Sequence, residues 1–161
     1  MKKLFLVLLC LAPMFVMGAV VRLAPNFALE GIGKTTTLRS FSGRPIVLIV
    51  AKSARESDFK AQVKRLKELY QEFASREVVF IAAFQDGSGS NDIRSDIPFI
   101  IAKDGAKVAA DYGVNDPFNL IIIGKDGNVD LQSAKVCPAT RVRDVIINSF
   151  VVQDAARKQD R

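Results

Sequence analysis

The hydrophobic positions of this chain gather in three continuous apolar runs. They cover Ile46–Ala51, residues 78–84 and residues 119–123. An apolar run of this length without alternation is typical of a strand that helices cover on both faces. The pattern therefore predicts a sheet whose central strands are buried on two sides.

A helical pattern lies between the first two runs. Its apolar positions follow the i, i+4, i+7 spacing of one stripe, formed by Phe59, Val63, Leu66, Tyr70 and Phe73. We expect one helix over residues 59–73, with Ser53 or Ser57 as a capping residue. A strand, a helix and a strand in this order predict a right-handed βαβ unit with parallel strands.

Shorter patterns precede and follow these elements. Residues 26–29 and 35–38 are rich in β-formers and flank a connection with two glycines. Residues 97–102 predict a short strand, and residues 106–112 predict a short helix that Gly113 closes.

The C-terminal part begins with a hairpin. The turn at residues 125–128 joins the third apolar run to a partner strand at 129–131. The last helix is expected to start near Pro138, and the polar tail at 154–161 is expected to fray.

The first 19 residues have the pattern of an export signal. Lys2 and Lys3 precede an apolar stretch at residues 4–16, and small residues follow at Gly18 and Ala19. We expect cleavage after Gly18 or Ala19, a domain over residues 20–153 and a tail over 154–161. An uncleaved anchor is one alternative.

A second alternative for the leader is lipidation at Cys10, although Leu8 and Leu9 before it are not the small residues that a lipoprotein signal requires. The expected product is exported, either periplasmic or extracellular. It has no membrane span in the mature chain.

Composition excludes several kinds of chemistry. The chain has no His, so no Ser-His-Asp or Cys-His pair can form, and the imidazole ligands of most catalytic zinc sites are missing. Of the two cysteines, Cys10 lies in the leader and only Cys137 remains, which leaves no intramolecular disulfide.

Charge and glycine spacing indicate no nucleic acid, metal or cofactor site. Loss of Lys2 and Lys3 lowers the net charge from +6 to +4, and the remaining charges are mixed in sign. Asp126 forms a hairpin turn, and Gly31 and Gly33 precede no helix, so neither pattern is a metal or dinucleotide motif. We expect an unknown protein or peptide as partner.

The order of elements resembles a thioredoxin-like domain. Several short sequence motifs of the chain resemble those of the redoxin branch, meaning peroxiredoxins of the alkyl-hydroperoxide-reductase and thiol-specific-antioxidant type. They are APNFAL at 24–29, FSGRPIVL at 41–48, IPF at 97–99 with DG at 104–105 and YGV at 112–114, and PFNLII at 117–122 with KDG at 125–127. The resemblance implies an α/β fold, a three-layer sandwich with a central mixed sheet flanked by helices.

The chain departs from this resemblance where the chemistry is expected. Thioredoxin-type enzymes carry CxxC after the first core strand, and peroxiredoxins carry a Thr or Ser followed by Cys in the same turn. The matching positions here read Arg55-Glu56-Ser57-Asp58, with no Cys. Neither standard mechanism can operate from this turn.

The sequence also resembles bacterial domains related to the DRO, equarin and sushi-repeat group, called DUDES-type domains. The similar segments are RPIVLIVA at 44–51, residues 60–69, REVVFI at 76–81 and LIIIGKDGNVDL at 120–131. That group is thioredoxin-like and has no established enzyme mechanism, so the resemblance supports fold and export.

The resemblance places a candidate groove beside the turn after the first core strand. Its residues are Ser53, Arg55, Ser57, Asp58 and Pro117. Pro117 occupies the place where thioredoxin-like folds carry a cis-proline, and the alternative is a turn proline before a strand. Solvated turn charges are the alternative for Arg55 and Asp58.

Cys137 is the candidate redox residue. It stands in the phrase VCPA near a helix start, with Lys135 and Arg141 nearby in sequence, and an inert, partly buried thiol is the alternative. The first functional hypothesis is a non-catalytic binding or accessory module of the cell envelope. The second is a thiol oxidoreductase or antioxidant protein that acts through Cys137, and the third is a structural surface protein.

Overall fold

The computed structural model describes residues 22–31 and 36–159, and the side chains of these residues up to 149. Its centre is a five-stranded sheet with the order β5-β4-β3-β6-β7. The strands are β3 (Ile46–Ala51), β4 (Val79–Phe84), β5 (Phe99–Ile101), β6 (Phe118–Ile123) and β7 (Val129–Ser133). β3, β4 and β5 are parallel, whereas β6 is antiparallel to both β3 and β7. The sheet is therefore mixed, and the predicted parallel pairing of β3 with β4 is confirmed.

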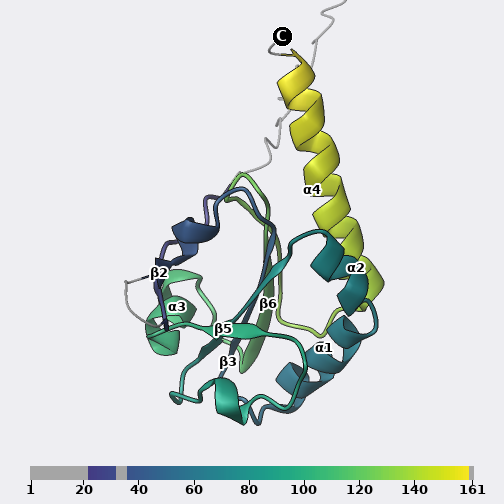
Figure 1. Ribbon diagram of the computed structural model, residues 1–161. Helices are drawn as coiled ribbons and strands as arrows, with labels where there is room; N and C mark the ends of the chain where they lie inside the picture. Colours follow the sequence, from purple (N-terminus) through teal and green to yellow (C-terminus); the bar gives the residue numbers. More distant parts are fainter. Residues whose placement is uncertain (1–21, 32–35, 160–161) are drawn as a thin grey trace, which may run out of the picture.

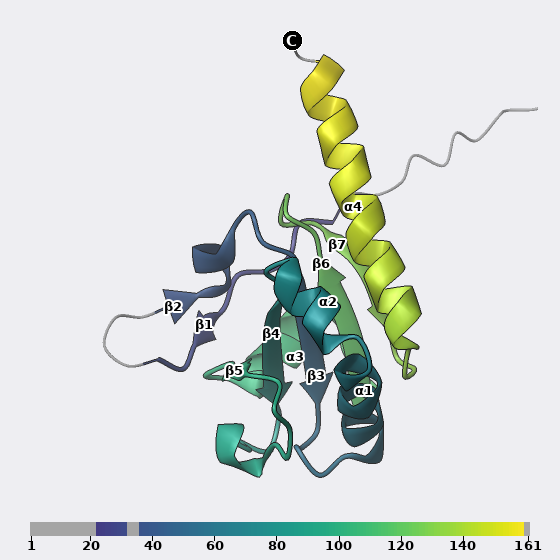
Figure 2. The ribbon, with the colours of Figure 1, turned by 45° about the vertical axis from the view of Figure 1, so that its right-hand side comes forward.

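Helices lie on both faces of this sheet (Figure 1). One face carries α1 (Ser57–Lys67), α2 (Tyr70–Ser75) and α4 (Ala139–Gln159). The other carries α3 (Gly105–Asp111), with η1 (Leu38–Phe41) and the small pair β1 (Ala28–Leu29) and β2 (Thr36–Thr37) at its side (Figure 2). A further short helix, η2 (Ser90–Asp92), lies in the loop that joins β4 to β5.

The side chains of β3 show why the apolar runs do not alternate. Val47 and Ile49 belong to the core under α1, α2 and α4, whereas Leu48 and Val50 belong to the core under α3. Every residue of β3, β4 and β6 is buried. This two-sided burial confirms the three-layer α/β sandwich.

The helix expected over residues 59–73 is in fact two helices. Glu68 and Leu69 donate their backbone N–H groups to carbonyl groups three residues earlier, and the α-helix ends there. The apolar stripe crosses the break, and the rings of Tyr70 and Phe73 both lie about 6 Å from the Phe80 ring. The sequence spacing identified the buried face and missed the change of direction.

Two further expectations differ from the structure. Leu38, expected at the end of a strand over residues 35–38, is instead the first residue of η1 and the one residue of η1 that is buried. At the other end, α4 is helical through Gln159, although the sequence predicts a fraying tail from residue 154. Figure 1 shows that this part of α4 rises beyond the sheet.

The hairpin between β6 and β7 and the end of α3 follow the predicted turn chemistry. Gly127 has φ = 81° and Gly113 has φ = 66°, a backbone conformation that favours glycine. Both glycines therefore satisfy a backbone requirement of their turns.

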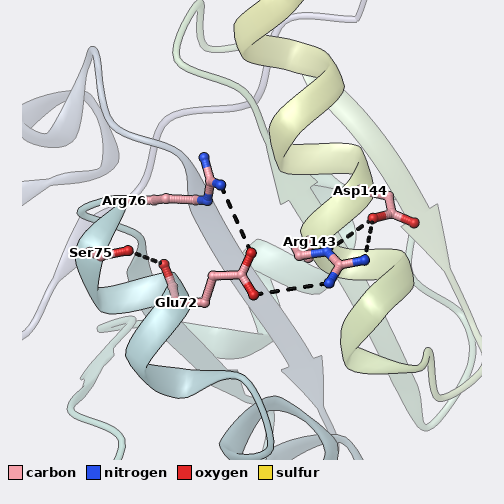
Figure 3. A network of polar contacts seen from close by, with 5 residues as sticks. All are labelled: Glu72, Ser75, Arg76, Arg143 and Asp144. Carbon is pink, nitrogen blue, oxygen red and sulfur yellow. Dashed lines mark hydrogen bonds and ion pairs between the residues drawn. The ribbon is translucent and has the colours of Figure 1, made fainter.

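Ion pairs join α2 to α4 (Figure 3). Glu72 lies 3.8 Å from Arg76, the residue that follows α2, and 4.0 Å from Arg143 on α4. Arg143 also pairs with Asp144 at 3.0 Å. All four side chains remain partly exposed, so the network contributes little to the stability of the fold. None of the helices in the described residues is long and apolar enough to cross a membrane.

Candidate functional site

The ends of β3 and β4 and the start of β6 meet at one edge of the sheet. The Lys52 N–H donates to the Pro117 carbonyl at 2.9 Å, and the Asp86 N–H donates to the Lys52 carbonyl at 3.0 Å. These bonds place the turn after β3 beside Pro117 and beside the loop after β4.

The turn between β3 and α1 is held by its own polar groups. The Ser53 hydroxyl accepts from the Arg55 N–H at 3.1 Å, and the Ser53 carbonyl accepts from the Glu56 N–H at 3.2 Å. Glu56 is the residue that caps α1, and no side chain caps this helix. The expected capping role of Ser53 or Ser57 is therefore wrong, because Ser53 bonds within the turn and Ser57 is already helical.

The loop after β4 supports this turn. The Ala54 N–H, in a residue only 3% exposed, donates to the Ser88 hydroxyl at 3.4 Å. Ser88 in turn donates its hydroxyl and its N–H to Asp86. These hydrogen bonds, with a smaller contribution from the charge of Arg55, lower the pKa of Asp86.

The predicted groove is assembled only in part. Pro117 does lie next to the turn, but every peptide bond of the described residues is trans, so the cis-proline expectation is wrong. In trans geometry the Pro117 carbonyl continues the pairing of β6 with β3. Ser57 and Asp58 are exposed and do not line the hollow that Arg55 lines.

A hollow beside Arg55 lies between α1 and the loop that contains η2. Its volume is about 670 Å³, within the range of small-ligand sites. Apolar side chains that line it are Ala54, Phe59, Val63 and Ile93. Phe59 is held at 5.0 Å from Phe84 and 6.0 Å from Phe99 between ring centroids, so this part of the wall is firmly packed.

The hollow is strongly basic. Five of its twelve lining residues are basic and one is acidic; the basic residues are Arg55, Lys60, Lys64, Lys67 and Arg94. The acid, Asp92, accepts a hydrogen bond from the Gly89 N–H at 2.8 Å and so stabilises the start of η2. The result is an apolar floor beneath a cationic rim.

Cys137 contacts a different side of α1 from the side that lines the hollow. The amide of Gln62 accepts from the Cys137 N–H at 2.7 Å and donates to the Cys137 carbonyl at 3.0 Å. The Cys137 Sγ lies 3.5 Å from the Lys135 carbonyl, a contact in which the thiol is the donor. Cys137 does stand before the start of α4, as predicted, but it does not line the hollow.

Sequence reasoning missed the far wall of the hollow. The polar loop that carries Asn91 and Arg94 is distant in sequence from α1, and nothing in its composition indicates a site. A signal was available on α1, where Lys60, Lys64 and Lys67 recur at helical spacing. Such a row is also typical of a solvated helix face, and only the loop opposite makes it a rim. In the described part of the chain, no three metal-binding side chains come together.

The sheet order, the helices on both faces and the turn after β3 define a thioredoxin-like α/β domain. A family described as "Domain of unknown function (DUF4174)" matches residues 38–148, and the chain belongs to this family. A search of curated proteins found no match.

Solved structures agree on the fold. The chain is similar to a crystal structure from Chlorobium tepidum described as a candidate thiol:disulfide interchange protein DsbE, with a TM-score of 0.65 and 18% identity over 80% of this chain and 96% of that one. A thiol:disulfide interchange protein from a Bacteroides species has a TM-score of 0.63 and 17% identity over 79% and 88%. A Plasmodium vivax 2-Cys peroxiredoxin has a TM-score of 0.57 and 15% identity over 84% and 96%. These likenesses confirm the redoxin-type fold and leave the activity open.

Proposed function

We propose that this protein is a non-catalytic binding module of the cell envelope, built on a thioredoxin-like fold. The observation that carries the proposal is the turn between β3 and α1. Residues 52–56 form it without a cysteine, while a basic hollow opens directly beside it. A carboxylate or hydroxyl in this turn cannot replace a thiolate, so binding is the role that the site supports best.

Thiol chemistry through Cys137 is the weaker alternative. Cys137 is the one cysteine of the described residues, it is partly buried, and its backbone is held by the buried Gln62 amide. A thiol–disulfide cycle at a lone cysteine also requires a second thiol from another molecule. No such group faces it in the described structure.

Two reduction assays test the non-catalytic role. The processed chain and a Cys137→Ser variant are compared for reduction of insulin disulfides and of hydrogen peroxide. We expect no turnover from either protein above the rate of the reductant alone. Turnover that disappears in Cys137→Ser would instead assign the protein to the one-cysteine redox class.

Export is the second part of the proposal. The sequence pattern of the first 19 residues supports it, and these residues lie outside the described structure. Expression of the full chain in a Gram-negative host, followed by fractionation and intact mass, tests it. We expect a periplasmic product cut after Gly18 or Ala19, and a full-length product in the cytoplasm would contradict export.

A further inference from the structure

We propose that the hollow between α1 and the η2 loop binds an extended acidic peptide whose acidic and apolar residues alternate. The inference rests on the proposed binding function and names its ligand class. It concerns the surface of α1 that faces η2, and not the turn beside Pro117.

The positive charges of the hollow lie in a row. Lys60, Lys64 and Lys67 occupy successive turns of one helix face, so the row is about 10 Å long at 1.5 Å per residue. Arg94 faces them from the η2 loop. One carboxylate or phosphate group reaches only one or two of these cations, whereas a ligand with several acids in line reaches them all.

The spacing of the row fits an extended chain. Lys60 and Lys64 are separated by about 6 Å along the helix axis and Lys64 and Lys67 by about 4.5 Å, and the flexible lysine stems can take up this difference. Side chains two apart in a strand are separated by about 6.7 Å and lie on the same side. Alternate acidic residues can therefore meet successive lysines while the residues between them contact the apolar floor at Phe59, Val63 and Ile93.

These cations make few polar contacts within the fold. The side chains of Lys60, Lys64 and Arg94 have no ion pair or hydrogen bond within the described residues, and Lys67 has only an exposed pair with Asp96 at 2.6 Å. Lys64 and Lys67 stand in the last turn of α1, where the helix dipole favours them. Lys60 lies near the other end, where the helix dipole disfavours a cation, and it repels Lys64 across one turn.

The test uses a pool of heptapeptides with Glu at four alternate positions and Leu, Val or Phe between them. Binding to the processed chain is followed by backbone-amide chemical shifts. We expect shifts in residues 54–67 and 91–95, and a dissociation constant that rises steeply with salt.

Two charge reversals give the matched comparison. Lys60→Glu replaces one cation of the row with an anion, so one attraction becomes a repulsion, and it is expected to weaken binding about tenfold. Lys103→Glu makes the same change of net charge at an exposed position outside the hollow and is expected to leave binding unchanged. A pool with Gln in place of Glu is expected not to bind.

Several results would overturn the proposal. These are shifts confined to other surfaces, no binding by the Glu pool, equal binding by Lys60→Glu, or equal binding by the Gln pool. Tighter binding of inorganic phosphate, octanoate or phosphatidylglycerol vesicles than of the peptides would replace the peptide with a small anion or a membrane surface. If the peptides do not bind and the protein shows no redox turnover, the peptide proposal is wrong and the non-catalytic function still stands. If the protein shows turnover that depends on Cys137, the proposed non-catalytic function is itself wrong.

Discussion

The side-chain amide of Gln62 makes two hydrogen bonds with the backbone of Cys137, 75 positions later in the sequence. Gln62 is fully buried on α1. A buried amide is tolerated only when its polar atoms have partners, and here those partners are the N–H and carbonyl of the segment that leads into α4. The pair therefore docks the start of α4 onto α1.

Loss of this amide is expected to be costly. Gln62→Ala leaves the Cys137 backbone groups without their partner and opens a small cavity, so we expect a loss of about 2–4 kcal/mol in the free energy of unfolding. Urea denaturation measures it, with Gln71→Ala on the exposed face of α2 as control. The Cys137 thiol is expected to react faster with a thiol reagent in Gln62→Ala. Equal stability of the two variants would contradict the docking role.

Lys60→Glu is expected to stabilise the fold. The change replaces a repulsive Lys60–Lys64 pair by an attractive Glu–Lys pair one turn apart and puts an acid in the first turn of α1. We expect these gains, about 0.5–1 kcal/mol, to exceed the repulsion from Glu56 four positions earlier. Thermal unfolding of this variant and of Lys103→Glu measures the effect. Higher stability together with weaker peptide binding would separate ligand recognition from folding. A destabilised Lys60→Glu protein would show that Lys60 has a structural role.

Gly105 is expected to tolerate no side chain. A Cβ at this first residue of α3 would overlap the backbone carbonyl of Phe84 at the end of β4, and backbone cannot move aside cheaply. We expect Gly105→Ala to lose more than about 2 kcal/mol of stability. Gly89→Ala is the control, since a Cβ there meets nothing within 4 Å. Similar denaturation midpoints for the two variants would refute this reasoning.

Asp130 gives a prediction about pH. Asp130 is an exposed residue of β7, but its carboxyl group is partly desolvated, which raises its pKa above the ordinary value of 3.8; a hydrogen bond from Ser149 opposes the shift, and the charge of Asp126 adds a smaller increase. A raised folded pKa means that the native state favours the protonated form, so this contribution to stability is present below pH 3.8 and is lost as the pH rises through the folded value. Asp130→Asn should therefore be more stable than the natural protein at pH 7, and this advantage should vanish below pH 3.8.

The control for Asp130→Asn is Asp116→Asn, which removes the same charge from an exposed position before β6. Denaturation at several pH values compares the two variants with the natural protein. An advantage of Asp130→Asn that stays constant with pH, or that Asp116→Asn shares, would exclude the proposed cause.

Local sequence patterns were sufficient to predict most of the fold. The three apolar runs became β3, β4 and β6, because only strands covered on both faces bury every side chain. Gly113 and Gly127 marked turns that need a positive φ, and Pro138 marked the start of α4. The break between α1 and α2 escaped prediction because the apolar stripe is continuous across it.

The candidate site was predicted less completely. The absence of a cysteine in residues 52–58 is a property of the sequence, and it excluded the standard redox mechanisms at once. The groove expected around Pro117 stays a prediction, and of its residues Arg55 lines the hollow beside α1.

The sequence by itself determined the class of fold, the missing thiolate and the two-sided burial of the sheet, because each depends on residue types at short spacing. Only the tertiary structure decided that Gln62 binds Cys137 and that Lys60 and Arg94 line the same hollow. Both relationships join segments about 30 or more positions apart. The path of the chain between them, rather than any local pattern, brings such segments together.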